Sequence, residues 1–199
     1  MKKKILKVLA LVACAVLLVV GSIAGTLAYM KDSVTVQNTF TAGNVAITMD
    51  EANVDLYGVP SGTRNAEGTG NEYKLIPGRT YTKDPVIRVE AGSEACYVFF
   101  KLENELLDNN GNSIANFDIN GTNWQLVDGE TNVYYYKDIL VAGDTCTAFT
   151  KFEIANNADV APFATGGSKE AAVVNVTAYA VQADGFDDAN AAWTAAEFN

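Results

Sequence analysis

The chain has 199 residues, with 14 Lys and Arg, 24 Asp and Glu, a formal net charge of −10 and no histidine. An acidic chain repels phosphate backbones and anionic lipids, so nucleic acid and anionic membranes are excluded as main partners. The absence of histidine excludes Ser-His and Cys-His nucleophile pairs, histidine-bearing zinc sites and the HExxH arrangement of metalloproteases.

The first 28 residues have the pattern of an export signal. Four lysines fall within the first seven residues, and an apolar run follows from Val8 to Val20. The small residues Thr26 and Ala28 stand where signal peptidases read the chain, so cleavage is expected to leave Tyr29 at the N-terminus. The run is also long enough to span a bilayer, and an uncleaved signal would anchor the protein to the membrane.

A second interpretation of the signal is a lipobox at residues 11–14 (LVAC), in which Cys14 would carry a lipid. A polar tether normally follows such a cysteine, whereas residues 15–20 continue the apolar run, so Cys14 is interpreted as part of the signal. Residues 29–199 are then expected to form one domain. Fourteen basic residues less the four lysines of the signal leave ten against 24 acidic residues, a formal charge of −14.

Directly behind the signal, residues 33–41 alternate apolar and polar side chains as an extended strand does. Val34, Val36 and Phe40 would share one face of that strand. Two interpretations stay open. The segment is either an edge strand of its own domain or a strand released by cleavage that adds to the exposed sheet edge of another copy.

The rest of the chain is dominated by short segments with a period of two. They cover residues 45–49, 87–89, 96–102, 124–126, 133–136, 146–154 and 174–180, and turn signals such as Pro77-Gly78 separate them. This pattern predicts an all-β, antiparallel β-sandwich.

Three polar stretches, 60–72, 105–123 and 155–170, are expected to be loops, the first of them mobile. Near the end, Asp187 or Asp188 is expected to cap a short C-terminal helix or turn that packs on the sandwich.

Two cysteines remain after the signal, Cys96 and Cys146, each on the more apolar face of its own predicted strand. An exported chain meets oxidising conditions, and a disulfide closing a loop of about 50 residues would contribute roughly 4 kcal/mol. Two buried thiols that act as small apolar side chains are the alternative. The sequence leaves both open.

Other patterns carry little chemistry. Residues 108–112 begin like a calcium loop, but the later positions do not fit, which favours a turn built on Asn-Gly. The adjacent carboxylates of Asp50 and Glu51 are interpreted as a solvated turn, and Tyr134–Tyr136 as strand packing instead of a carbohydrate platform. No catalytic residue, metal ligand or cofactor is predicted.

Four segments in order resemble the landmarks of the TasA/camelysin family. They are residues 25–32 (GTLAYMKD), 38–51 (NTFTAGNVAITMDE), 75–104 (LIPGRTYTKDPVIRVEAGSEACYVFFKLEN) and 173–186 (VVNVTAYAVQADGF). The resemblance implies a protein of Gram-positive bacteria that a SipW-type signal peptidase processes and that is secreted to the extracellular matrix and cell surface. It also implies a jelly-roll-like sandwich that polymerises with itself, or with paralogous subunits, into biofilm-matrix fibres by donor-strand exchange.

The sequence and the resemblance lead to one leading function and two alternatives. The leading one is a structural fibre protein whose residues 29–41 form an assembly strand. The alternatives are a camelysin-type surface protease or other hydrolase, and a monomeric adhesin or accessory fibre subunit. The metalloprotease activity described for some camelysins is not carried over, because this sequence lacks histidine and a recognisable zinc motif.

Overall fold

The computed structural model describes residues 43–65, 69–169 and 172–198. Contacts divide the chain into two units, Met1–Thr41 and Ala42–Asn199, and all described residues belong to the second unit. The predicted signal peptide and assembly strand lie outside the described residues.

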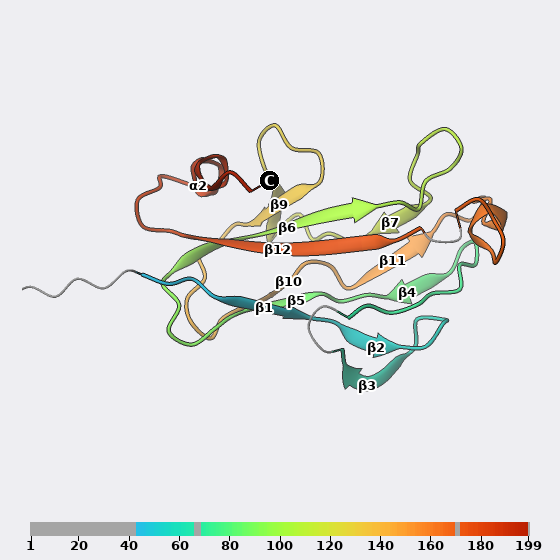
Figure 1. Ribbon diagram of the computed structural model, residues 1–199, viewed down its shortest axis with the longest axis horizontal. Helices are drawn as coiled ribbons and strands as arrows, with labels where there is room; N and C mark the ends of the chain where they lie inside the picture. Colours follow the sequence, from blue (N-terminus) through green and yellow to red (C-terminus); the bar gives the residue numbers. More distant parts are fainter. Residues whose placement is uncertain (1–42, 66–68, 170–171, 199) are drawn as a thin grey trace, which may run out of the picture. The chain divides into compact units, whose positions relative to one another are not determined.

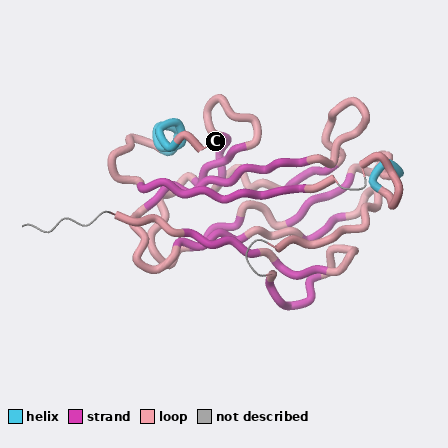
Figure 2. Tube along the Cα trace, viewed as in Figure 1, coloured by secondary structure: helices cyan, strands magenta, loops and turns pink. Residues whose placement is uncertain are grey.

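Twelve strands and two short helices make up the described part of the chain (Figures 1 and 2). They are β1 (Ile47–Asp50), β2 (Ala52–Val54), β3 (Pro60–Arg64), β4 (Thr80–Thr82), β5 (Val86–Val89), β6 (Cys96–Asn104), β7 (Ala115–Phe117), β8 (Trp124–Leu126), β9 (Val133–Tyr136), β10 (Thr145–Thr147), β11 (Lys151–Ile154), the 3₁₀ helix η1 (Ala161–Phe163), β12 (Val174–Gln182) and α2 (Ala189–Ala196). All strand pairs are antiparallel.

The first layer joins two short sheets, β1-β5-β10 and β4-β11-β7. Ile87 pairs with Cys146 and Tyr81 pairs with Phe152, which is the same register on both sides of the interruption. Backbone hydrogen bonds from Ala148 to Pro85 and from Lys83 to Thr150 continue the ladder between them. The two sheets therefore act as one layer that is four strands wide. The interruption lies next to Pro85, which has no backbone N–H to donate to the ladder.

The second layer has the order β12-β6-β9-β8. Its longest pair is β6 with β12, which runs in register from Cys96 opposite Gln182 to Asn104 opposite Val174. The chain crosses repeatedly between layers, since β5, β7 and β10 belong to the first and β6, β8 and β12 to the second. This connectivity is jelly-roll-like, and the predicted all-β antiparallel sandwich is confirmed.

The main core lies between the two layers. Alternate residues of β6, namely Cys96, Val98 and Phe100, point into it and are fully buried, as the period of two predicted. Trp124 closes it from β8, with its ring edge-on to Phe100 at 4.7 Å between centroids and its indole N–H donating to the Thr147 carbonyl at 2.8 Å. Burying an indole is favourable here because its one donor is satisfied.

A second apolar cluster covers the outer face of the β12-β6-β9-β8 sheet. Tyr97 and Phe99, which alternate with the core residues of β6, are buried there beneath α2. Trp193 of α2 lies 5.1 Å from the ring of Phe99. The helix begins as predicted, because the Asp188 carboxylate accepts a hydrogen bond from the Ala191 backbone N–H. Residues 96–100 of β6 are thus buried on both faces of this sheet.

Two of the predicted loops contain strands. Pro60–Arg64 lies in the stretch expected to be a mobile loop, yet it forms β3 and pairs with β2. The turn between them places Gly58 at φ +76°, against Tyr81, where a Cβ atom would come within 2.8 Å of the Tyr81 Cα atom. Only glycine fits that turn. Likewise Ala115–Phe117, within the expected loop 105–123, forms β7 and pairs with β11.

Candidate functional site

The predicted cleavage residues Thr26, Ala28 and Tyr29 and the predicted assembly residues Val34, Val36 and Phe40 lie outside the described residues. The described residues bear only on the surface to which such a strand would add.

Cys96 and Cys146 are both buried in the core cluster between the layers, and their sulfur atoms are not bonded to each other. Burial, with the charge of Asp144 as a second cause, raises the pKa of the Cys96 thiol. Burial also raises the pKa of Cys146 to about 12. Both side chains therefore act as protonated, inaccessible apolar groups and carry no reactive chemistry in the folded protein.

Within residues 43–65, 69–169 and 172–198, each layer ends at the same side of the sandwich in a strand that has a paired neighbour on one side only. Among the described residues, β12 pairs only with β6, and β1 pairs only with β5. Hydrogen bonds from Glu105 to Val173 and from Ala183 to Ala95 fix the phase of the β6–β12 ladder. Because an antiparallel ladder alternates, the odd residues of β12 face β6 and its even residues direct their N–H and C=O groups to the open edge.

The same residues also carry the inward side chains. Val176, Ala178 and Ala180 of β12, and Val45, Ile47 and Met49 in and before β1, pack on the core yet remain half-buried. We call these six residues with their two strand edges the seam. The seam offers unpaired backbone groups and apolar contact surface along one line, the two features by which a sheet edge accepts an added strand.

The distance between β1 and β12 decides whether an added strand can pair with both edges or with only one. A strand paired with both edges would need β1 and β12 to be about 9–10 Å apart, twice the spacing of paired strands. Some Cα atoms of β1 already lie within 8 Å of β12. An added strand therefore pairs with one edge, and β12, with nine residues against four in β1, is the longer one.

A polar pocket of about 200 Å³ lies at the Val174 end of the seam. Its lining combines seam residues with charged ones: Met49, Asp50, Glu51, Thr69, Gly70, Lys83, Pro85, Val174, Asn175 and Val176. Lys83 and Glu51 form a buried ion pair, with 2.7 Å between Nζ and Oε2 and side chains 10% and 8% exposed. The Asn71 amide donates to the other Glu51 oxygen, Oε1, at 3.0 Å.

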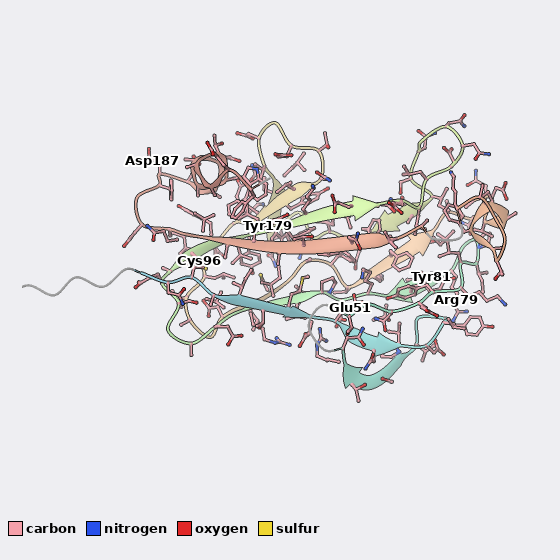
Figure 3. The ribbon with its side chains drawn as sticks, in the orientation of Figure 1. Glu51, Arg79, Tyr81, Cys96, Tyr179 and Asp187 are labelled. Carbon is pink, nitrogen blue, oxygen red and sulfur yellow. The ribbon has the colours of Figure 1, made fainter. Side chains whose placement is uncertain are left out.

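The interpretation of Asp50 and Glu51 as a solvated turn is wrong, because both carboxylates are held in ion pairs. Figure 3 shows Glu51 where β1 passes into β2. The guanidinium of Arg64 bridges Asp50 and Asp84, and Arg88 donates to Asp50 as well. Burial favours the neutral acid of Asp50, but the hydrogen bonds from the two arginines outweigh it and lower its pKa. This network holds the β2–β3 hairpin to the first layer.

The other candidates have structural roles. Tyr134 stacks on Phe100 at 5.0 Å, and Tyr136 meets Trp124 edge-on at 5.1 Å, so the tyrosine run packs as interpreted. The Asp108 carboxylate accepts from the backbone N–H groups of Asn110 and Asn112, which makes a turn of the predicted kind. Among the described residues, no three His, Cys, Asp or Glu side chains are grouped so that they could hold a metal ion.

Sequence reasoning did not single out Lys83, and it interpreted Glu51 as part of a solvated turn. Lys83 stands in no recognisable motif, and the pair is surrounded by segments that are distant in the sequence, among them β12 and the loop that carries Asn71. In the part of the chain that the structure describes, no helix is long and apolar enough to cross a membrane. Comparisons of the chain with family models, with curated proteins and with solved structures found no match.

Proposed function

We propose that the chain is a secreted structural protein that polymerises into extracellular fibres, with residues 33–41 of one copy adding as a strand to the β12 edge of the next. The observation that carries the proposal is the seam: a nine-residue edge strand whose outward backbone groups and half-buried apolar side chains lie on one line. The family resemblance of the sequence supports the same function.

The segment and the edge match in length and chemistry. Residues 33–41 and β12 each have nine residues. Side chains at Val34, Val36 and Phe40 would cover the inward residues of the seam, since residues directly opposite in adjacent strands point to the same face. Main-chain hydrogen bonds supply affinity in such strand addition, and the apolar side chains supply specificity.

Assembly by this route gives an open polymer, because the donor segment and the acceptor edge are different surfaces of the same chain. A head-to-tail contact of this kind repeats without closing unless its rotation forms a ring. The proposal therefore includes fibres that lengthen with protein concentration. A monomeric adhesin or accessory subunit would use the same fold without lengthening.

The first test uses purified protein beginning at Tyr29, which is concentrated and examined by electron microscopy and sedimentation. Wild-type protein should form fibres, and the double variant Val34→Asp/Val36→Asp should not, because charge would enter an apolar groove at a cost of several kcal/mol. The matched control is Thr35→Asp/Gln37→Asp, which places the same charges on the opposite face and should assemble. Fibres from the first variant equal to those from the control would refute the proposal.

The second test addresses the acceptor edge. Ala178→Pro removes an N–H group that faces the open edge, while Thr177→Pro removes one that donates within the β6–β12 ladder. Ala178→Pro should leave a folded monomer that cannot accept a strand, whereas Thr177→Pro should lower the thermal midpoint. Normal fibre growth by folded Ala178→Pro protein would exclude β12 as the acceptor.

Casein cleavage by the purified protein that a chelator abolishes would favour the hydrolase alternative instead. Processing is tested separately: N-terminal sequencing of the extracellular protein should begin at Tyr29. A sequence beginning at Met1, or a lipid on Cys14, would overturn the predicted signal cleavage.

A further inference from the structure

We infer that the polar pocket at the end of the seam receives the side chain of Asn38 from the docking segment, and that this contact fixes one direction and one register of the added strand. In this arrangement the strand runs antiparallel to β12, with Asn38 opposite Val176 and Val36 opposite Ala178. The inference rests on the proposed function and adds the specificity of the same site.

The direction follows from where the chain enters β1. Glu94 donates to the Asn44 carbonyl, and the neighbouring Ala95 accepts from the Ala183 N–H, so the start of the β1 segment and the end of β12 meet at one end of the sandwich (Figure 1). A segment that continues β1 outward from this end would reach the opposite, Val174 end of a next copy that is stacked in the same orientation. It then runs in the direction of β1, which is antiparallel to β12.

The docking segment carries one polar residue on its apolar face. The alternation that places Val34, Val36 and Phe40 inward also places Asn38 inward, between the last two. A primary amide buried against apolar side chains without hydrogen bonds is destabilising. The favoured register is therefore the one that gives Asn38 polar partners.

The pocket supplies such partners at one place along the seam. The Lys83 ammonium has three N–H donors, and among the described residues one acceptor, Glu51 Oε2, is bonded to it. Both side chains line the pocket beside Val176. An amide entering there can accept from Lys83 Nζ through its oxygen and donate to the Glu51 carboxylate through its nitrogen, which no apolar side chain can do.

The remaining contacts of this register are also compatible. Val34 and Val36 lie opposite Ala180 and Ala178, whose small side chains leave room for a branched one, and Phe40 lies opposite Val174. A shift by two residues would set Asn38 opposite Ala178 and Phe40 opposite Val176, beside the ion pair. A shift by one residue would turn every apolar side chain outward.

The register is tested by cross-linking between copies. Protein carrying Val36→Cys is mixed with protein carrying Ala178→Cys, allowed to assemble, oxidised with diamide and run on a non-reducing gel. Residues directly opposite in a hydrogen-bonded antiparallel pair have Cα atoms about 5.5 Å apart, within the range that a disulfide spans. A disulfide-linked dimer should form, and because each copy has one new cysteine, it reports only contacts between copies.

The controls are mixtures of Val36→Cys with Ala180→Cys, of Thr35→Cys with Ala178→Cys, and of wild type with Ala178→Cys, none of which should give the dimer. Fibres accompanied by cross-linking to Ala180→Cys, or by no cross-link to Ala178→Cys, would overturn the register and leave the proposed function standing. If wild-type protein forms no fibres and the mixture of Val36→Cys with Ala178→Cys forms no cross-linked dimer, both the register and the proposed function are overturned.

A second measurement addresses the amide itself. Asn38→Leu should raise the critical concentration for fibre growth about tenfold or more, because the hydrogen bonds to charged partners are lost. The matched change on the opposite face, Gln37→Leu, should leave it unchanged. Equal critical concentrations for the two variants would show that Asn38 does not enter the pocket.

Discussion

The buried ion pair of Glu51 and Lys83 makes a sharp prediction about stability. Replacing Lys83 with Met keeps most of the apolar stem but removes the ammonium from a carboxylate that is 8% exposed. Of the Glu51 contacts described above, only the hydrogen bond from Asn71 remains. Removing one partner of a buried pair typically costs about 3–5 kcal/mol, a large part of the roughly 5–15 kcal/mol that stabilises a domain.

The prediction has a second half that separates a buried charge from simple loss of packing. The double variant Lys83→Met/Glu51→Leu removes both charges, so it should recover most of the loss, since two apolar side chains of similar volume often replace a buried pair without penalty. The single and double variants form a double-mutant cycle whose coupling energy measures the pair.

The assay is urea unfolding at neutral pH, followed by the fluorescence of Trp124 and Trp193, which report on the core and on the α2 face. Lys101→Met is the control, because its ion pair with Glu103 is largely solvent-exposed. Lys101→Met should leave the unfolding free energy nearly unchanged. The reasoning fails if Lys83→Met is no more destabilising than Lys101→Met, or if the double variant is less stable than Lys83→Met alone.

Three further predictions concern other groups. Burial favours the neutral form of Asp50, but the hydrogen bonds from Arg64 and Arg88 outweigh it and lower the pKa of this carboxyl in the folded protein. These hydrogen bonds therefore stabilise the fold above the ordinary carboxyl pKa near 4, and the stabilisation is lost as the pH falls through the lowered pKa of the folded state. Arg64→Met should therefore be less stable than wild type near neutral pH and equally stable near pH 2, as measured by thermal melts. Cys96 and Cys146 should react with a thiol reagent at pH 8 only as fast as the protein unfolds, and rapid labelling of the native protein would contradict their burial. Asp188→Ala should lower the unfolding free energy by about 1 kcal/mol through loss of the α2 cap, and no change in the melt would show that the cap is unimportant.

The period of two in the sequence predicted most strands and the inward side of β6, because a half-buried strand must alternate. It also predicted a cap at Asp187 or Asp188, because capping depends on local residues, and the structure uses Asp188. It could not predict β3, since Pro60–Arg64 has five exposed residues and no apolar face to alternate. It could not predict β7 either, since three residues are too few to show a period. The burial of Lys83 and Glu51 depends on distant segments that pack around them, such as β12 and the loop that carries Asn71, and the open edge of β12 depends on which of the described strands pair with it. Both are tertiary outcomes that no local pattern encodes.

The pairing of β12 with β6 has a consequence for the timing of assembly. Phe99 pairs with Tyr179, so the second layer is completed by contacts between distant parts of the chain, which form slowly in folding. Until β12 is in place, the proposed acceptor edge does not exist. In the proposed polymer, an incomplete or unfolded chain would carry a donor segment but no acceptor, so it could end a fibre and could not extend one.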